Sequence, residues 1–133
     1  MISWREESDL LRCSPSFFDA PRYDSIIFHD FGDTLTFAKL VFAIVCDLPH
    51  SRDKIPMLLV QPMQQVQRRP MDRELGLYPL KAKPRAQCRF IPLQSLIRGA
   101  VLYEDTMRAG HYFAVDVIDS DMFARVRSCF QGY

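Results

Sequence analysis

The feature that most constrains the fold is a series of apolar segments, rich in β-branched and aromatic residues, that are joined by short connections. Such segments occupy residues 23–31, 36–46, 57–62, 75–83, 89–91, 99–103 and 111–119. Their composition is typical of β-strands. Parallel strands need a crossover of a dozen or more residues, usually a helix, and no helical segment separates these candidates. The sequence therefore predicts a mainly β fold, a small antiparallel barrel or curled sheet of five to seven strands with a short C-terminal helix.

Turn residues and prolines set the expected limits of several strands. Gly32 and Asp33 predict a turn after the first strand. The second strand also has apolar residues at helical spacing, but its β-branched and aromatic content favours a long strand. Because proline has no N–H for a sheet ladder, Pro62 is expected to end the third strand and Pro79 to mark the fourth as an edge strand.

The segment SDMFARVRSCF, residues 120–130, predicts the C-terminal helix. Its apolar residues recur at helical spacing. Either Asp119 or Ser120 stands where an N-cap is expected, and Asp121 places a negative charge in the first turn. The chain is therefore expected to finish with a short amphipathic helix packed on the sheet.

The length of 133 residues fits a single domain. We expect residues 1–22, interrupted by Pro15 and Pro21, to form a partly ordered N-terminal arm, and residues 23–133 to form one β-rich domain. The four cysteines have no C-x-x-C spacing, and the first residues contain no apolar segment of the signal-peptide type. We therefore expect reduced thiols and an intracellular location. The longest apolar run, residues 40–46, is too short to cross a membrane.

The stretch SIIFHDFGDTL, residues 25–35, comes close to the strand and D-x-D-G-T-L loop of haloacid-dehalogenase-type phosphohydrolases. In that chemistry the first Asp attacks the phosphate, and an acid two residues later protonates the leaving group. Here Asp30 has Gly32 at that second position, and Asp33 is displaced to the other face of an extended chain. The sequence therefore favours a hairpin turn. A metal-dependent phosphohydrolase that uses Asp30, with His29 and Asp33, is kept as an alternative.

No other motif predicts catalysis or a cofactor. The three histidines lack metal-ligand spacing, and no serine lies in a G-x-S-x-G context. The acidic run DVIDSDMF lacks the glycine bend and the final glutamate of a calcium-binding loop, so helix capping explains it more simply. We therefore expect a non-catalytic protein with no metal, cofactor, small-molecule substrate or membrane partner.

Charge is unevenly distributed along the chain, although the net charge is +1. Residues 64–98 carry eight basic side chains against two acidic ones, whereas residues 1–34 carry three basic and seven acidic ones. Tyr78 and Phe90 lie among the basic residues, as a surface that stacks on bases requires. We expect a positive stripe that binds DNA, RNA or a chromatin protein. Its residues are Arg68, Arg69, Arg73, Lys81, Lys83, Arg85 and Arg89.

Two other interpretations of this basic segment stay open. Its charges can pair with the acidic flanks of the same molecule and form a solvated face. They can also meet the acidic flanks of a second copy, which would make the chain a structural or oligomerisation domain. The isoelectric point near 7.7 is lower than that expected of a dedicated nucleic-acid binder.

Five segments of the chain carry a resemblance to a known family. They are YDSIIFHDFGDTLTFAKLVFAIV, MLLVQPM, RRPMDRELGLYPLKAKPR, FIPLQSLIRGAVLYED and YFAVDVIDSDMFARV. On these segments, residues 23–126 resemble a small domain found beside Kyakuja–Dileera–Zisupton-type transposon proteins of mushroom-forming fungi. The layout of strands is also similar to that of BAH-type chromatin modules, which are small β-barrels that bind histone tails or other proteins. The resemblance implies a nuclear interaction module of transposon origin, and it assigns no activity.

Overall fold

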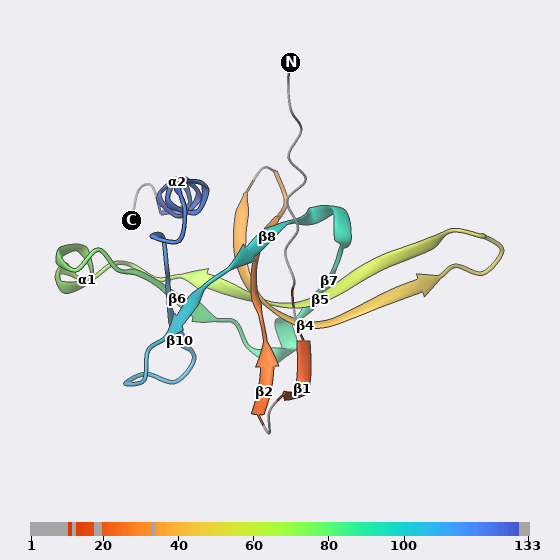
Figure 1. The fold of residues 1–133 in the computed structure, drawn as a ribbon, viewed down its shortest axis with the longest axis horizontal. Coiled ribbons are helices and arrows are strands. Elements are labelled where there is room, and N and C mark those ends of the chain that lie inside the picture. The colour runs from red at the N-terminus through yellow and green to blue at the C-terminus, as the bar shows by residue number, and fades with distance from the viewer. Residues whose placement is uncertain (1–10, 12, 18–19, 33, 131–133) are drawn as a thin grey trace, which may run out of the picture.

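The computed structural model describes residues 11, 13–17, 20–32 and 34–130 of the 133-residue chain. Ten strands, two α-helices and two 3-10 helices are assigned in this part (Figure 1). The strands are β1 (Cys13–Phe17), β2 (Ala20–Tyr23), β3 (Ser25–His29), β4 (Leu35–Asp47), β5 (Lys54–Gln65), β6 (Tyr78–Ala82), β7 (Arg89–Pro92), β8 (Leu96–Ala100), β9 (Leu102–Glu104) and β10 (His111–Ala114). The helices are α1 (Pro70–Glu74), η1 (Arg85–Gln87), η2 (Leu93–Ser95) and α2 (Ser120–Cys129).

Eight of the strands form one antiparallel sheet. Its order is β8-β3-β4-β5-β6-β10-β9, and β7 pairs with β5 beside this path. Along β5, the partner at residues 63–65 is β6, and the partner at residues 57–60 is β7. Within the described part of the chain, β1 pairs with β2 alone, and the two form a separate two-stranded sheet.

The two edges of this order are nearly continuous in sequence. β8 and β9 are separated only by Val101, whose carbonyl accepts a hydrogen bond from the N–H of Val115 at 3.0 Å. The same stretch of chain therefore pairs with β3 through its first half and with β10 through its second half. The sheet is curled, but its ladders do not form a closed ring within the described residues.

Apolar side chains on one face of the sheet pack beneath α2. β3, β4, β5 and β6 contribute Ile27, Phe37, Met63 and Leu80. α2 contributes a buried methionine and a buried valine, and its C-cap residue, Phe130, is buried as well. The ring of Tyr78 lies 5.1 Å from that of Phe130, centroid to centroid. Because the apolar residues of α2 face the sheet at helical spacing, the helix is held by this burial.

A second cluster lies on the opposite face. Side chains alternate along a strand, so Ile26 and Phe28 of β3 point away from Ile27. They pack with Leu40, Val60 and other buried residues of β4, β5 and β7. Ile26, Ile27 and Phe28 are fully buried, which shows that β3 is covered on both faces.

The expected fold class is confirmed. The molecule is mainly β and antiparallel, with a short C-terminal helix, and the predicted curled sheet is the form that it takes. The long strand expected at residues 36–46 is β4, and Asp119 is the N-cap of α2, where its Oδ1 accepts a hydrogen bond from the N–H of Met122 at 2.7 Å. The sheet has eight strands because the expected strand at residues 99–103 is divided at Val101 between two different neighbours.

Both proline predictions were wrong. β5 continues through Pro62, and β6 is an inner strand although it contains Pro79. The carbonyl of Pro62 accepts a hydrogen bond from Lys83 in the gap between β6 and β7, and that of Pro79 accepts one from Val66 just beyond the end of β5. In an antiparallel strand the N–H and the C=O of one residue point to the same side. The side on which each proline lacks an N–H is therefore the side of the gap or of the strand end, where the sheet needs no donor.

The structure also contains elements that the sequence did not predict. The helix α1 is one, with proline at its first position. The hairpin of β1 and β2 is another, and it lies largely within the expected N-terminal arm, whose residues 1–10, 12 and 18–19 are outside the described part. Among the described residues, no helix is long and apolar enough to cross a membrane.

Candidate anion-binding site

A group of charged side chains gathers where α1, β6 and the turn between β9 and β10 meet. Lys81 of β6 lies directly opposite His111 of β10, so both side chains project from the same face of the sheet. The turn is held beside the end of β6 by a hydrogen bond from the N–H of Ala82 to the carbonyl of Gly110, at 2.8 Å. Gly110 has a φ of +76°, a conformation that favours glycine.

The turn between β9 and β10 is fixed by an ion pair. Arg108 Nε donates to Asp105 Oδ2 at 2.8 Å, and the N–H of Met107 donates to Asp105 Oδ1 at 3.0 Å. These hydrogen bonds stabilise the carboxylate, so the pKa of Asp105 lies below its ordinary value. The guanidinium of Arg108 is thereby held next to the β6–β10 ladder.

A second ion pair is built into the start of α1. The carboxylate of Asp72 is almost fully buried and accepts three hydrogen bonds from Arg69, one each from the backbone N–H, Nε and Nη2, at 2.8–3.1 Å. The side-chain hydrogen bonds from Arg69 are the main reason that the pKa of Asp72 is lowered, and Arg108 adds to the effect. The electrostatic coupling to Arg108 connects α1 to the turn between β9 and β10.

Two nitrogens in this region have no hydrogen-bond partner. Arg108 Nη2 and His111 Nδ1 are buried and unpaired within the described structure. Burial lowers the pKa of His111, and the positive charges of Arg108 and Lys81 lower it further, so the imidazole is neutral at pH 7. Buried polar atoms usually have a partner, and an orphaned pair therefore marks a position where a ligand, water or ion is expected.

We call this set the cationic cluster. It contains three cations, two carboxylates and a neutral imidazole: Arg69, Lys81, Arg108, Asp72, Asp105 and His111. The two carboxylates are bound by Arg69 and Arg108, and Lys81 has no carboxylate partner in the described part of the chain. The cluster thus keeps one uncompensated positive charge next to an unpaired guanidinium N–H.

The structure divides the seven basic residues of the predicted stripe. Arg69 and Lys81 belong to the cationic cluster, and Arg73 is exposed on α1. Lys83 and Arg85 follow the end of β6, and the described residues provide no carboxylate partner for either side chain. Two of the seven residues, Arg69 and Lys81, therefore belong to the cluster, and Arg73, Lys83 and Arg85 follow them closely in sequence.

Arg68 and Arg89 occupy other positions. Arg68 lies over the ring of Tyr78, 4.6 Å from its centroid, and donates from Nε to the carbonyl of Leu77 at 2.9 Å. Since Tyr78 packs on the α2 face of the sheet, strand alternation places Arg68 on the opposite face from Lys81. Arg89, in β7, forms an ion pair with Asp30, which follows β3.

The phosphohydrolase-like stretch is a hairpin. β3 and β4 are antiparallel and pair from Ser25↔Lys39 to His29↔Leu35 across the turn. Asp30 begins this turn, and its carboxylate accepts hydrogen bonds from Arg89, Thr36 and the N–H of Phe31. Asp33 lies outside the described residues.

Carboxylates of the acidic run at the start of α2 are also bound by arginines of the same chain. Arg98 Nη1 and Nη2 bind both oxygens of Asp119, and Nη1 also binds Asp121. Asp121 accepts a further hydrogen bond from Arg125 at 2.8 Å. No group of three or more potential metal-ligating side chains occurs among the residues that the structure describes.

Sequence reasoning did not identify Arg108, His111 and Asp72 as members of a site. A local signal existed for Asp105 and Arg108, which are spaced i, i+3, and for Asp72, which is the third residue of a helix with proline at its first position. The position of His111 opposite Lys81 depends on the β6–β10 register, and no local pattern reveals that register.

Comparison of the chain with protein-family models, with curated proteins and with solved structures finds no match.

Proposed function

We propose that this chain is a non-catalytic interaction module that binds nucleic acid through phosphate contacts at the cationic cluster. The observation that carries the proposal is that Lys81, which has no carboxylate partner in the described residues, and Arg108, whose buried Nη2 is unpaired, both act electrostatically on His111. A phosphate oxygen supplies both the negative charge and the hydrogen-bond acceptor that these groups lack. Arg73, Lys83 and Arg85, which lie on either side of Lys81 in the sequence, add positive charge to this part of the chain.

The expected affinity is modest and depends on salt. Phosphate contacts release counterions, and binding that rests on them alone has dissociation constants on the order of 10⁻⁴ to 10⁻⁶ M. The net charge of +1 and the pI near 7.7 agree with a small contact area rather than an extensive one. The resemblance of residues 23–126 to a transposon-associated domain adds a DNA context and a nuclear location to this proposal.

An oligomerisation domain is the second candidate, and the intramolecular ion pairs count against it. It requires the acidic flanks to be available to the basic segment of another copy. Asp30, Asp119 and Asp121 are already bound by arginines of their own chain. A phosphohydrolase centred on Asp30 ranks below both, since Arg89 occupies the carboxylate that would act as the nucleophile.

The test is fluorescence anisotropy with labelled double-stranded DNA at several salt concentrations. Neutralisation of two residues, in the variant Lys81→Gln/Arg85→Gln, is expected to weaken binding and to lower the slope of log K against log salt by about 2. The matched control is Arg52→Gln/Arg127→Gln, which removes the same charge from two exposed arginines without carboxylate partners in the described structure.

Equal losses in the two double variants would show that net charge alone drives binding and would refute the site. Binding that is insensitive to salt would refute the phosphate contacts themselves. Absence of nucleic-acid binding, together with retention of an acidic protein partner that K81Q/R85Q abolishes, would assign the same surface to protein recognition. Arg69 and Arg89 are unsuitable for this test because both neutralise partly or fully buried carboxylates.

A further inference from the structure

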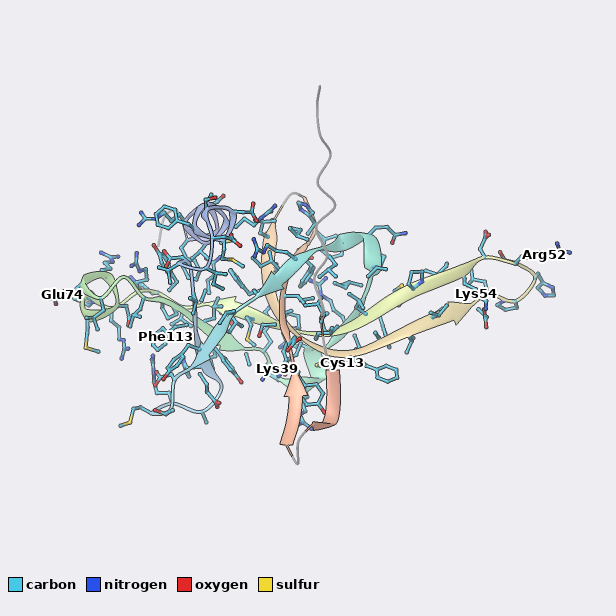
Figure 2. The ribbon with its side chains drawn as sticks, viewed as in Figure 1. Cys13, Lys39, Arg52, Lys54, Glu74 and Phe113 are labelled. Atoms are coloured by element: carbon cyan, nitrogen blue, oxygen red, sulfur yellow. The ribbon has the colours of Figure 1, made fainter. Side chains whose placement is uncertain are left out.

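β4 and β5 run side by side over most of their length and then separate (Figure 1). Figure 2 shows their paired part extending to Arg52 at one end of the molecule, with Glu74 of α1 at the opposite end. The ladder between the two strands stops at Ala38↔Pro62. Beyond this pair, residues 35–37 pair with β3 and residues 63–65 pair with β6, and no ladder of the described chain joins the two segments. The sheet therefore has a gap between them.

Backbone amides of both segments face this gap. The N–H of Val66 donates to a carbonyl of β6, so strand alternation points the N–H and C=O of Gln65 toward β4. The N–H of Leu40 donates to a carbonyl beside β3, so the same groups of Leu35 point toward β5. Continued at its register, the ladder would pair Leu35 with Gln65. Each of these residues instead presents a donor and an acceptor to the gap.

A pocket of about 390 Å³ opens at the gap, next to the last residue of α2. Phe37, Met63 and Leu80 form its apolar lining and are at most 4% exposed. Nε2 of Gln65 donates to the carbonyl of Cys129 at 2.7 Å, which ties α2 to β5 and leaves Oε1 of Gln65 as an acceptor. The volume lies near the lower end of the range for small-molecule sites, about 300–1,000 Å³. We call this the gap pocket.

No charged side chain is among the described residues that line the gap pocket. Burial raises the pKa of the Cys129 thiol, so this group is also neutral at pH 7. An ion placed here would lose hydration without meeting an opposite charge, which is strongly unfavourable. Lys81 follows Leu80 along β6 and therefore points to the other face of the sheet. The gap pocket is thus separate from the cationic cluster, and an inference about it does not rest on the proposed function.

The chemistry of the gap identifies the class of ligand. A neighbouring strand satisfies the donors and acceptors of a strand edge with amide groups. A carboxamide carries an N–H donor and a C=O acceptor side by side, whereas a carboxylate only accepts hydrogen bonds and an ammonium only donates them. We propose that the gap pocket binds a small uncharged carboxamide. Its amide lies between Leu35 and Gln65, and its apolar body lies against Phe37, Met63 and Leu80.

Two-dimensional ¹H–¹⁵N NMR of the full wild-type chain tests the proposal, with benzamide as the probe and benzoate as its control. The two compounds have nearly the same size and shape and differ in charge. Benzamide is expected to bind saturably, with a dissociation constant on the order of 1 mM for so small a ligand. Benzoate is expected to bind at least about tenfold more weakly, because its carboxylate would enter the pocket without a cation. The amide signals expected to shift are those of residues 34–37, 63–65, 80 and 129.

A pair of cysteine variants provides a second test. Cys129→Met extends a longer side chain into the gap pocket and is expected to weaken benzamide binding at least about fivefold. Cys88→Met is the matched control, since Cys88 is half-buried like Cys129 but is not part of the pocket lining, and it is expected to keep the wild-type affinity. Equal binding of benzoate and benzamide, or shifts confined to other parts of the molecule, would overturn the proposal. Absence of saturable shifts, or equal affinities of C129M and C88M, would overturn it as well.

Discussion

Arg89 and Asp30, which are 59 residues apart in sequence, form an ion pair at the rim of the second core cluster. Nη2 of Arg89 donates to Oδ2 of Asp30, and the guanidinium lies over the ring of Phe28, 5.4 Å from its centroid. Thr36 donates to the same carboxylate oxygen, and the N–H of Phe31 donates to the other. The pair connects β7 to the turn between β3 and β4. The aspartate that suggests a nucleophile in the sequence is a structural group of the fold.

Replacement of Asp30 by Asn is expected to lower the free energy of unfolding at pH 7 by about 1–2 kcal/mol, since hydrogen bonds to a charged group are lost. Burial alone would raise the pKa of Asp30, but the hydrogen bonds from Arg89, Phe31 and Thr36 outweigh it, and the pKa is lowered below 3.8. The stabilisation is therefore complete above pH 3.8 and disappears as the pH falls through the lower, folded-state value.

Urea unfolding of the wild-type and Asp30→Asn chains across this range measures the difference. The two unfolding free energies are expected to converge at acid pH. Asp53→Asn, in the exposed turn between β4 and β5, is the control and is expected to have little effect. A gap between wild type and D30N that persists below the folded-state pKa would contradict an ionic origin.

Local patterns predicted the elements whose determinants are local. The strand β4 follows from its β-branched composition, and Asp119 acts as the cap of α2 because a side-chain acceptor stands just before a helical repeat. The predictions from Pro62 and Pro79 were wrong because a strand can contain a proline where the neighbouring strand has ended and no N–H is needed. That position is a property of the whole sheet, and no short window of sequence contains it.

The candidate site was predictable only in part for the same reason. A basic segment is visible in the sequence, but only the side chains without carboxylate partners in the same molecule keep a positive charge that is available to a ligand. The partner of Arg69 is three residues away, and that of Arg89 is 59 residues away. The register of β6 and β10, which brings His111 opposite Lys81, is equally non-local. Composition therefore indicated a basic surface, and only the three-dimensional fold shows which basic residues belong to it.

Asp72 is expected to be a stability residue of the cationic cluster. Its buried carboxylate accepts three hydrogen bonds from Arg69, the N-cap of α1, so Asp72→Ala removes the acceptor for the backbone N–H and the guanidinium of the N-cap residue. A loss of about 1–2 kcal/mol in unfolding free energy is expected, as for a lost helix cap. Glu74→Ala in the same helix is the control, since Glu74 is exposed. Chemical denaturation at pH 7 measures both, and equal effects would show that Asp72 has no special role.

Arg98 is expected to hold the start of α2 against β8. It binds Asp119 and Asp121 with three hydrogen bonds of 2.9–3.1 Å, and these bonds are the main reason that its pKa is raised. Because the pairs are partly exposed, salt is expected to weaken them. Arg98→Gln should therefore accelerate hydrogen exchange of the first turns of α2 at low salt, with a smaller difference at high salt. Arg127→Gln on the same helix should have no such effect, and unchanged exchange in R98Q would refute the clamp.

The protonation of His111 is expected to make stability depend on pH near neutrality. Burial lowers the pKa of His111 below 6.5, and the charges of Arg108, Lys81 and Arg69 lower it further against the opposing effect of Asp105. The unfolded chain therefore binds a proton at a higher pH than the folded chain does. Stability is complete above about pH 6.5 and falls as the pH drops from there to the folded-state pKa.

Thermal unfolding between pH 8 and pH 5 tests this dependence, in variants that lack the titrating group. His111→Gln is expected to flatten the decline, because glutamine does not ionise in this range. His29→Gln changes an exposed histidine at the end of β3 and is expected to retain the wild-type slope. If phosphate occupies the cluster as proposed, it stabilises the charged imidazole, so added phosphate should also reduce the decline in the wild-type chain and have little effect on H111Q. A decline that is identical in H111Q and wild type would place its origin elsewhere in the molecule.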